Sequence, residues 1–256
     1  MPNLNYLFQQ ELTVYSKVNN HRAISAGDVL IHCQVVGESE ATPLLFLHGN
    51  GEDLHIFDPQ IAYFSKSYKV VAIDTRGHGE STRGTEPLTF DTFAADLITL
   101  LDALHIKQAH LVGFSDGAVT ALHTAIKHPK RILSMVLLGA NYTPRGFKWF
   151  PYISVRLVYA WLCVVSLFAK SKRLQREIWG LMVYQPHLTL DEIGGIRVPT
   201  LVVTGEKDMV SQRQNNKMCR AIEGAQRLVI EGGDHFWILK QPDVLNNVIM
   251  HFLIKG

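Results

Sequence analysis

Short runs of apolar and β-branched residues alternate with segments of helical periodicity along most of the chain. The later runs are apolar almost without interruption, which is typical of strands buried on both faces of a parallel sheet. The segments before Leu44 have no helical pattern between them, so we expect an antiparallel edge there. The alternation predicts an α/β protein with a mostly parallel sheet. The runs predicted to be strands are Leu30–Val36, Leu44–Leu47, Val70–Ile73, His110–Gly113, Ile132–Leu138, Thr200–Thr204 and Arg227–Ile230.

Three segments show the spacing of amphipathic helices. In the first of them, Phe93, Leu97 and Leu101 recur at intervals of four residues and so mark one buried face. The second ends before Pro129, which cannot continue a helix. The predicted helices are Phe90–Leu104, Ala118–Lys127 and Asp243–Leu253.

The segment 141–190 interrupts this alternation, because no strand pattern appears in it. Its stretch Tyr152–Ala169 is almost wholly apolar and comes close to the length of a membrane-spanning helix. Arg156 interrupts the stretch, and a charge at the bilayer centre costs about 2.5–3.5 kcal/mol. We therefore predict inserted helices that cover one end of the sheet. The predicted division is a core domain, 1–140 and 191–256, with a helical cap or lid, 141–190.

The composition places the chain among globular proteins. It has 256 residues, of which 47% are hydrophobic and 19% charged, so it is not intrinsically disordered. The net charge of +2 gives no reason to expect nucleic-acid binding. The three cysteines, Cys33, Cys163 and Cys219, are widely spaced, which argues against disulfides and a zinc site. No signal-peptide pattern is visible at the N-terminus, so a cytoplasmic location is expected.

The near-neutral total hides a charge asymmetry. The segment 141–190 contains seven basic residues and one acidic residue, whereas the rest of the chain contains 18 and 22. Its basic cluster, 170–176, follows directly on the apolar stretch. One interpretation is a weak contact of this basic, apolar cap with an acidic membrane surface. The other is a solvated face that keeps an apolar helix soluble.

The sequence Gly113-Phe114-Ser115-Asp116-Gly117 is a G-x-S-x-G motif between a predicted strand and a predicted helix. This is the context of a nucleophile elbow, a sharp turn that exposes the serine Oγ above the sheet. Larger side chains two positions before and after the serine would clash in so tight a turn. The motif therefore predicts that Ser115 is a nucleophile.

Three further motifs accompany the elbow: HGNG at 48–51, DTRGHGES at 74–81 and GDHF at 233–236. On these four motifs, in this order, the chain resembles the α/β-hydrolase fold family over nearly all of its length. The resemblance implies a mostly parallel eight-stranded sheet flanked by helices. It also implies an inserted helical cap after the sixth strand, which is where 141–190 falls.

A nucleophilic serine needs a base that is oriented by an acid, and in this fold the chain order is serine, acid, histidine. Residues 117–176 contain no carboxylate, and Glu177, Asp191 and Glu192 belong to the cap or its exit. Asp208 follows the strand Thr200–Thr204 and occupies the position that matches the family's acid turn. Glu206 is the alternative.

Five histidines follow Ser115: His123, His128, His187, His235 and His251. His235 comes after the last predicted strand, where the family's histidine loop falls. Its neighbour Asp234 is expected to be a solvated carboxylate. The predicted triad is therefore Ser115, Asp208 and His235, whereas His48 and the motif at 74–81 are expected to hold loops near the site.

An acyl-transfer site also needs backbone N–H donors for the oxyanion, each worth about 2.7–4 kcal/mol of barrier. One donor should be the N–H of Asp116, and by resemblance the other is the N–H of Asn50. The Asp116 side chain has two candidate roles. It could attract a substrate ammonium group, or it could act as a favourable acid at the helix N-terminus, which we prefer.

The resemblance implies a carboxylesterase-like serine hydrolase that cleaves a small or medium acyl ester through a covalent acyl-enzyme, with no cofactor and no metal. The expected partner is a small-molecule acyl substrate. Hydrolysis of a carbon–carbon bond or an amide, cofactor-free perhydrolysis, and a low-turnover ligand receptor are the alternatives. The sequence assigns neither substrate-binding residues nor an oligomeric state.

Overall fold

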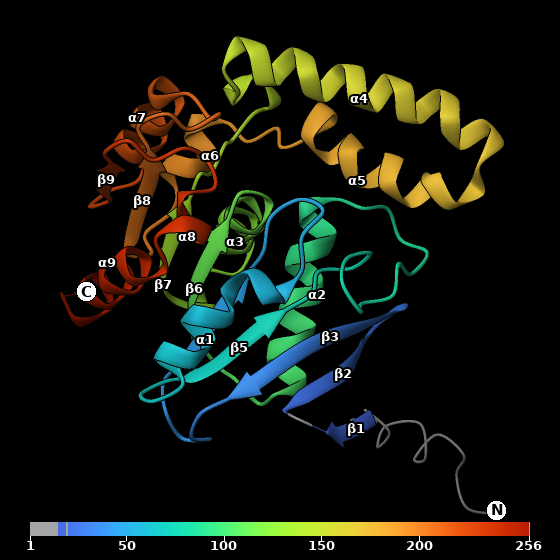
Figure 1. Cartoon of the computed structure of the whole chain (residues 1–256). Helices are drawn as coiled ribbons and strands as arrows, with labels where there is room; N and C mark the ends of the chain where they lie inside the picture. The colour runs from blue at the N-terminus through green and yellow to red at the C-terminus, as the bar shows by residue number, and fades with distance from the viewer. Residues whose placement is uncertain (1–14, 19, 256) are drawn as a thin grey trace, which may run out of the picture.

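A nine-stranded sheet organises the described residues, 15–18 and 20–255, of this computed structural model (Figure 1). Its spatial order is β1-β2-β3-β5-β4-β6-β7-β8-β9. Most of the N-terminal stretch that bears on a signal peptide lies outside the described residues. The strands are β1 Tyr15–Val18, β2 His21–Ala26, β3 Val29–Val36, β4 Pro43–Leu47, β5 Lys69–Ile73, β6 Ala109–Phe114, β7 Ile132–Leu138, β8 Thr200–Gly205 and β9 Gln226–Ile230.

Strand pairing matches the expected mostly parallel sheet. Strands β5, β4, β6, β7, β8 and β9 pair in parallel, whereas β1, β2 and β3 form the antiparallel edge that was expected before Leu44. The expected number of eight strands corresponds to β2–β9, and β1 adds a short ninth strand outside them. Strand β2 was not among the predicted runs, because its sequence HRAISA lacks a continuous apolar run, and only Ile24 and Ala26 in it are buried.

Burial on both faces holds for the central strands but not for β9. Four of the five residues of β9 are exposed, and Leu228 and Val229 are among them. The prediction of a fully buried strand over Arg227–Ile230 is therefore wrong. The physical reason is position: β9 is the last strand of the sheet and pairs only with β8.

Helices cover both faces of the sheet. The alternation of side chains along each strand divides the core in two: Leu45 and Leu47 pack with α2 and α3, whereas Leu44 and Phe46 pack with α1 and α9. The helices are α1 Asp58–Phe64, α2 Phe90–Ala103, α3 Asp116–Lys127, α4 Trp149–Phe168, α5 Arg173–Tyr184, α6 Leu190–Gly194, α7 Gln212–Ala221, α8 Trp237–Lys240 and α9 Pro242–Lys255. Short 3-10 helices are η2 Leu54–Phe57, η3 Pro129–Arg131, η4 Pro144–Gly146 and η5 Lys170–Lys172.

The predicted cap segment, 141–190, contains the helix pair α4 and α5. Figure 1 shows this pair above the end of the sheet where the parallel strands finish, with α5 nearer the core and α4 outside it. No described residue between β7 and β8 belongs to a strand of the sheet. The apolar stretch Tyr152–Ala169 thus lies almost entirely on α4.

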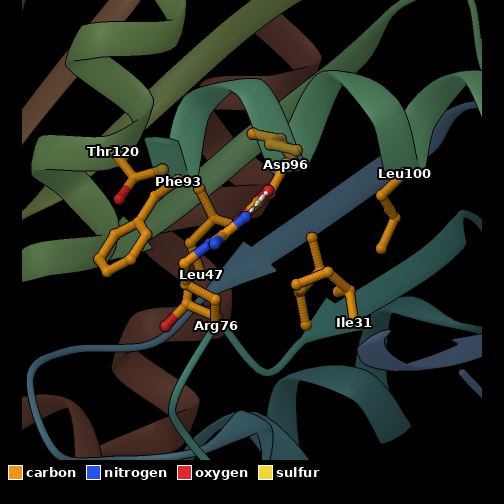
Figure 2. Close-up of a pocket in the computed structure, with 10 residues that line it drawn as sticks. Ile31, Leu47, Arg76, Phe93, Asp96, Leu100 and Thr120 are labelled. Atoms are coloured by element: carbon orange, nitrogen blue, oxygen red, sulfur yellow. Dashed lines mark hydrogen bonds and ion pairs between the residues drawn. The ribbon is translucent and has the colours of Figure 1, made fainter. Parts of the chain in front are cut away.

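A buried ion pair joins the loop after β5 to α2. The Arg76 guanidinium donates from Nε and Nη2 to the two carboxylate oxygens of Asp96, both at 2.7 Å, and from Nη1 to Asp28 Oδ1 at 3.1 Å. Arg76 is 2% exposed, and Figure 2 shows it pointing to Asp96 beside Leu47 and Phe93. The free space here is about 10 Å³, which is too small for a ligand. The cluster is therefore a structural contact between loop and helix.

Burial raises the pKa of Asp96 above its ordinary value, although the bonds from Arg76 oppose the shift. The pKa of Arg76 is raised, chiefly because of its hydrogen bonds to Asp96. Both pKa shifts are those of an ion pair that is hydrogen-bonded internally but poorly hydrated. Losing Arg76 would leave the Asp96 charge buried and uncompensated, and losing Asp96 would leave the buried Arg76 with only its bond to Asp28.

Replacing Asp96 should therefore destabilise the fold strongly. We expect Asp96→Ala to lower the free energy of unfolding by about 3–5 kcal/mol, because Arg76 stays buried and loses its two-bonded partner, keeping only the bond to Asp28. Urea denaturation followed by circular dichroism measures this change. The control is Glu223→Ala, which removes the exposed partner of Arg197 and should change stability little. Equal losses in the two variants would contradict the assignment.

Candidate active site

Ser115 occupies a strained turn between β6 and α3. Its φ of 52° and ψ of −115° are unusual for any residue with a side chain. A Cβ on Gly113 would lie 2.4 Å from Gly117 O, and a Cβ on Gly117 would lie 2.1 Å from Leu47 O. Only glycine fits at both positions, so the two glycines of the motif allow the sharp turn that the sequence predicts.

The structure brings Ser115, His235 and Asp208 together. His235 Nε2 lies 3.2 Å from Ser115 Oγ, and His235 Nδ1 lies 2.8 Å from Asp208 Oδ1. Asp208 is fully buried and His235 is 6% exposed. Because a carboxylate only accepts, the proton sits on Nδ1, which leaves Nε2 free to accept from the serine hydroxyl.

Two close contacts hold the acid and the histidine in place. The Val210 N–H donates to Asp208 Oδ1 at 2.9 Å. Gly139, at a φ of 62°, lies against the imidazole ring, where an added Cβ would come within 2.8 Å of His235 Cε1. The ring therefore packs on bare backbone on one side while its two nitrogens contact Asp208 and Ser115.

The alternative acids lie elsewhere. Glu206 Oε2 accepts a hydrogen bond from the Gly232 N–H at 2.9 Å. Asp234 accepts from the Phe236 N–H at 3.0 Å and forms an exposed ion pair with Lys240. Neither carboxylate is bonded to His235, so the geometry favours Asp208 over Glu206.

The two predicted oxyanion donors have free backbone N–H groups. Among the described residues, no hydrogen-bond acceptor pairs with the N–H of Asn50 or of Asp116. Asn50 follows β4, and Asp116 begins α3 directly after Ser115. Asp116 is the chain neighbour of Ser115, and Asn50 lines the same cavity as Ser115, so both residues are at the site with N–H groups that no described acceptor uses.

The Asp116 side chain points to Asn50 and is absent from the cavity wall described below. Its Oδ2 accepts from Asn50 Nδ2 at 2.8 Å, and the same amide nitrogen donates to Ile178 O on α5 at 2.8 Å. Burial raises the pKa of Asp116 to about 6, although the bond from Asn50 opposes the shift. The Asn50 side chain, for which the sequence suggested no role, therefore links the elbow to the helix pair above it.

Glu52 is a site residue that sequence reasoning missed. Its Oε2 accepts from the Gly49 N–H at 2.9 Å, and its side chain lines the same cavity as Ser115 and His235. Burial raises its pKa to about 7, while the Gly49 N–H and His235 oppose the shift. The sequence does show an acid two residues after Asn50. Whether its side chain points into the site depends on the conformation of the loop, which the sequence does not reveal.

A cavity of about 550 Å³ lies above the serine. The α4–α5 pair and the loops at the strand ends form its wall, which is mostly apolar and contains a few polar groups. This is the character of a small-molecule site. The apolar residues lining it are Phe114, Phe147, Val155, Leu174, Ile178, Trp179, Met182, Met209 and Phe236, and the polar ones are Asn50, Glu52, Ser171 and Gln175.

The other motif residues brace these loops. His48 Nε2 accepts from the Thr75 N–H at 3.0 Å, and its Nδ1 lies 2.7 Å from Gly49 O. Asp74 accepts from the Leu54 N–H at 2.8 Å and contacts His32 Nδ1 at 2.7 Å. These contacts join the loop that carries Asn50 to the loop after β5.

His78 is buried, and burial lowers its pKa to about 4, so its ring is neutral near pH 7. It lies against the ring of His48, 5.1 Å away between centroids. It does not line the cavity. Its surroundings are those of a packed side chain in the loop after β5.

Comparisons with known proteins support the fold. The model of the alpha/beta hydrolase fold matches residues 42–161. The serine hydrolase BPHL from Mus musculus is 29% identical over 254 residues, which cover 90% of this chain and 85% of that protein. The 3-oxoadipate enol-lactonase 2 from Acinetobacter baylyi is 36% identical over 114 residues, which cover 44% of this chain and 43% of that protein.

Among solved structures, an enol-lactonase from Burkholderia xenovorans superposes with a TM-score of 0.75 at 23% identity, over 91% of this chain and 99% of that one. The chain has the α/β-hydrolase fold, and its residues 42–161 match the model of that family. The relatives named here are hydrolases, which supports hydrolase activity for this chain.

The raised pKa of Glu52 predicts a dependence of stability on pH. Between its ordinary value of 4.5 and about 7, the folded chain binds this proton more than the unfolded chain does, so stability falls as the pH rises through this window. Glu52→Gln removes the titration. The free energy of unfolding of the variant minus that of the parent chain should be larger at pH 8 than at pH 5. The expected increase is on the order of 1 kcal/mol.

Chemical denaturation at the two pH values measures the difference. The control is Glu38→Gln, which changes an exposed carboxylate outside the cavity. If the relative stability of both variants changed by the same amount between pH 5 and pH 8, Glu52 would behave like a surface carboxylate and the prediction would be wrong.

Proposed function

We propose that this protein is a serine hydrolase that cleaves an ester of a small or medium acyl group through a covalent acyl-enzyme. The observation that carries the proposal is the contact chain from Ser115 Oγ to His235 at 3.2 Å and on to Asp208 at 2.8 Å, at the floor of the cavity. A weak hydroxyl nucleophile becomes reactive when a neighbouring base is oriented by a third group.

In the proposed reaction, Ser115 Oγ attacks the ester carbonyl while His235 Nε2 takes the serine proton. The N–H groups of Asn50 and Asp116 stabilise the oxyanion. The imidazolium then returns the proton to the leaving alkoxide, which departs as an alcohol and leaves the acyl group on the serine. Water attacks this acyl-enzyme in the same way, with His235 as base, and releases the acid.

Asp208 accepts from Nδ1–H throughout and so keeps the imidazole in the tautomer that the reaction needs. It also stabilises the imidazolium that forms. Its burial keeps competing water away from the carboxylate. The proposed role is positional and electrostatic.

The cavity wall supports an apolar acyl or aromatic group as the substrate's larger part. Trp179 and Met182 from α5 and Phe147 before α4 supply apolar surface, while Glu52 is the one acidic side chain in the wall and His235 the one histidine. Esters include lactones, which are cyclic esters, and one relative is named an enol-lactonase. We therefore include lactones in the proposed substrate class.

A fluorophosphonate probe tests the nucleophile directly. We expect one probe per chain on the parent protein and none on Ser115→Ala, because the probe reacts only with an activated serine. Intact-protein mass spectrometry measures the stoichiometry. A parent protein that stays unlabelled would favour a ligand-binding role over hydrolysis.

The assignment of the acid is tested by a matched pair. Asp208→Asn should lower kcat by about 10³–10⁴-fold, because the amide favours the wrong imidazole tautomer. Glu206→Gln, two residues earlier in the same turn, should leave kcat nearly unchanged. The assay is hydrolysis of p-nitrophenyl esters of graded chain length, and the opposite ranking would transfer the role to Glu206.

A further inference from the structure

Helix α4 carries an unusual apolar surface on its solvent side. Its exposed large apolar residues, which we call the outer stripe, recur at intervals of three and four and so share one face. Phe168 is 87% exposed and Trp149 is 77% exposed. The outer stripe consists of Trp149, Phe150, Ile153, Leu157, Trp161, Val164, Leu167 and Phe168.

The inner face of the same helix is the one that packs on the protein. Val155, Leu162 and Ser166 are buried, and α5 lies beneath them (Figure 1). A surface helix normally turns its apolar face inward and its polar face to water. Here both faces are apolar, which marks the outer one as an interaction surface.

Within the described residues, α4 is the one helix long and apolar enough to cross a membrane. Its packing speaks against a span. The buried side chains tie it along the top of α5, and Arg156 lies in its middle, with its guanidinium 4.4 Å from the centre of the Tyr152 ring. The solvent-facing side of α4, and not either of its ends, is therefore the surface that is available to a binding partner.

Positive charges surround the outer stripe. Lys148 precedes the helix, Arg156 lies on it, and Lys170 and Arg173 follow its far end, all of them exposed. None of these four forms an ion pair with any residue that the structure describes. The nearest acid in the sequence, Glu177, is paired with Arg83. The surface thus combines apolar side chains with unneutralised cations.

The charge decides between two occupants. A second copy of the chain, docked stripe to stripe, would bring two basic surfaces together at a cost in repulsion. An anionic lipid bilayer satisfies both features, since the apolar side chains enter the acyl boundary and the cations meet the lipid phosphates. Trp149 and Trp161 belong to the residue type that favours the membrane interface.

We propose that α4 docks this protein on the surface of an anionic lipid bilayer, through the outer stripe and the cations beside it. The helix lies in the interfacial plane, with α5 and the core on the aqueous side. The inner face of the pair, including Val155 and Leu174, lines the cavity. Docking therefore holds the cavity one helix layer below the lipid, whether or not Ser115 is catalytic.

Vesicle co-sedimentation of the full chain tests the proposal. Vesicles of phosphatidylcholine with one-third phosphatidylserine should bind the protein at least tenfold more tightly than phosphatidylcholine alone, and added salt should weaken this binding. The combined variant Leu157→Gln, Trp161→Gln, Val164→Gln should lose at least tenfold in affinity. The variant Lys170→Gln, Arg173→Gln should lose about tenfold on anionic vesicles only.

Two controls match these changes on other surfaces. Lys130→Gln with Lys217→Gln removes two exposed cations of the core, and Ile254→Gln removes one exposed apolar side chain of α9. Both controls should bind like the parent chain. Circular dichroism checks that each variant is folded, which is expected because every changed side chain is exposed.

Three outcomes would overturn the proposal. The parent chain could fail to bind anionic vesicles, or the stripe variant could bind as well as the parent. Analytical ultracentrifugation could instead find a dimer that the stripe variant abolishes, without vesicle binding. That last result would assign the surface to a second copy of the chain. Probe labelling of Ser115 is independent of all three, so failure here leaves the proposed hydrolase function to its own test.

Discussion

The strained turn at Ser115 is the constraint on which the site depends. A side chain at a φ of 52° costs on the order of 1–3 kcal/mol, and it persists only when its surroundings fix it. Here the close approach of Gly117 to Leu47 O locks α3 against the end of β4. The same approach aims the serine Oγ away from the sheet and leaves the Asp116 N–H free at the start of the helix. Strain, nucleophile position and donor position are consequences of one packing contact.

The second requirement is that loops from distant parts of the chain meet at one edge of the sheet. Parallel strands bring their carboxyl ends to the same edge, so the loops after β4, β6, β8 and β9 are neighbours. A Cβ on Gly205 would lie 2.3 Å from Gly233 O, so only glycine lets the turn of Asp208 approach the loop of His235 this closely. Buried polar contacts of His48 and Asp74 then fix the loop that carries Asn50.

The parts that could be predicted from the sequence are those with a local pattern. The parallel strands follow from apolar runs, and Ser115 follows from glycines at fixed offsets. The contacts of Asp208 and His235 followed from chain order and the resemblance. Glu52, the Asn50 side chain and the cavity wall could not be predicted, because each depends on contacts between segments far apart in the chain. The exposed β9 was missed because a hydrophobic run does not reveal whether a strand lies at a sheet edge.

The apolar stretch in the cap shows how the same residues support two different roles. Its periodicity is helical, but periodicity alone does not say which face is turned inward. In the structure Val155 helps to line the cavity, whereas Leu157 and Trp161 face solvent on the opposite side. One helix thus separates a small-molecule cavity from an apolar, basic outer surface. A surface of this kind is unfavourable in water unless it is covered, and its cations favour an anionic cover over another copy of itself. Part of the hydrophobic content of the chain therefore lies outside the core, on the outer stripe of α4.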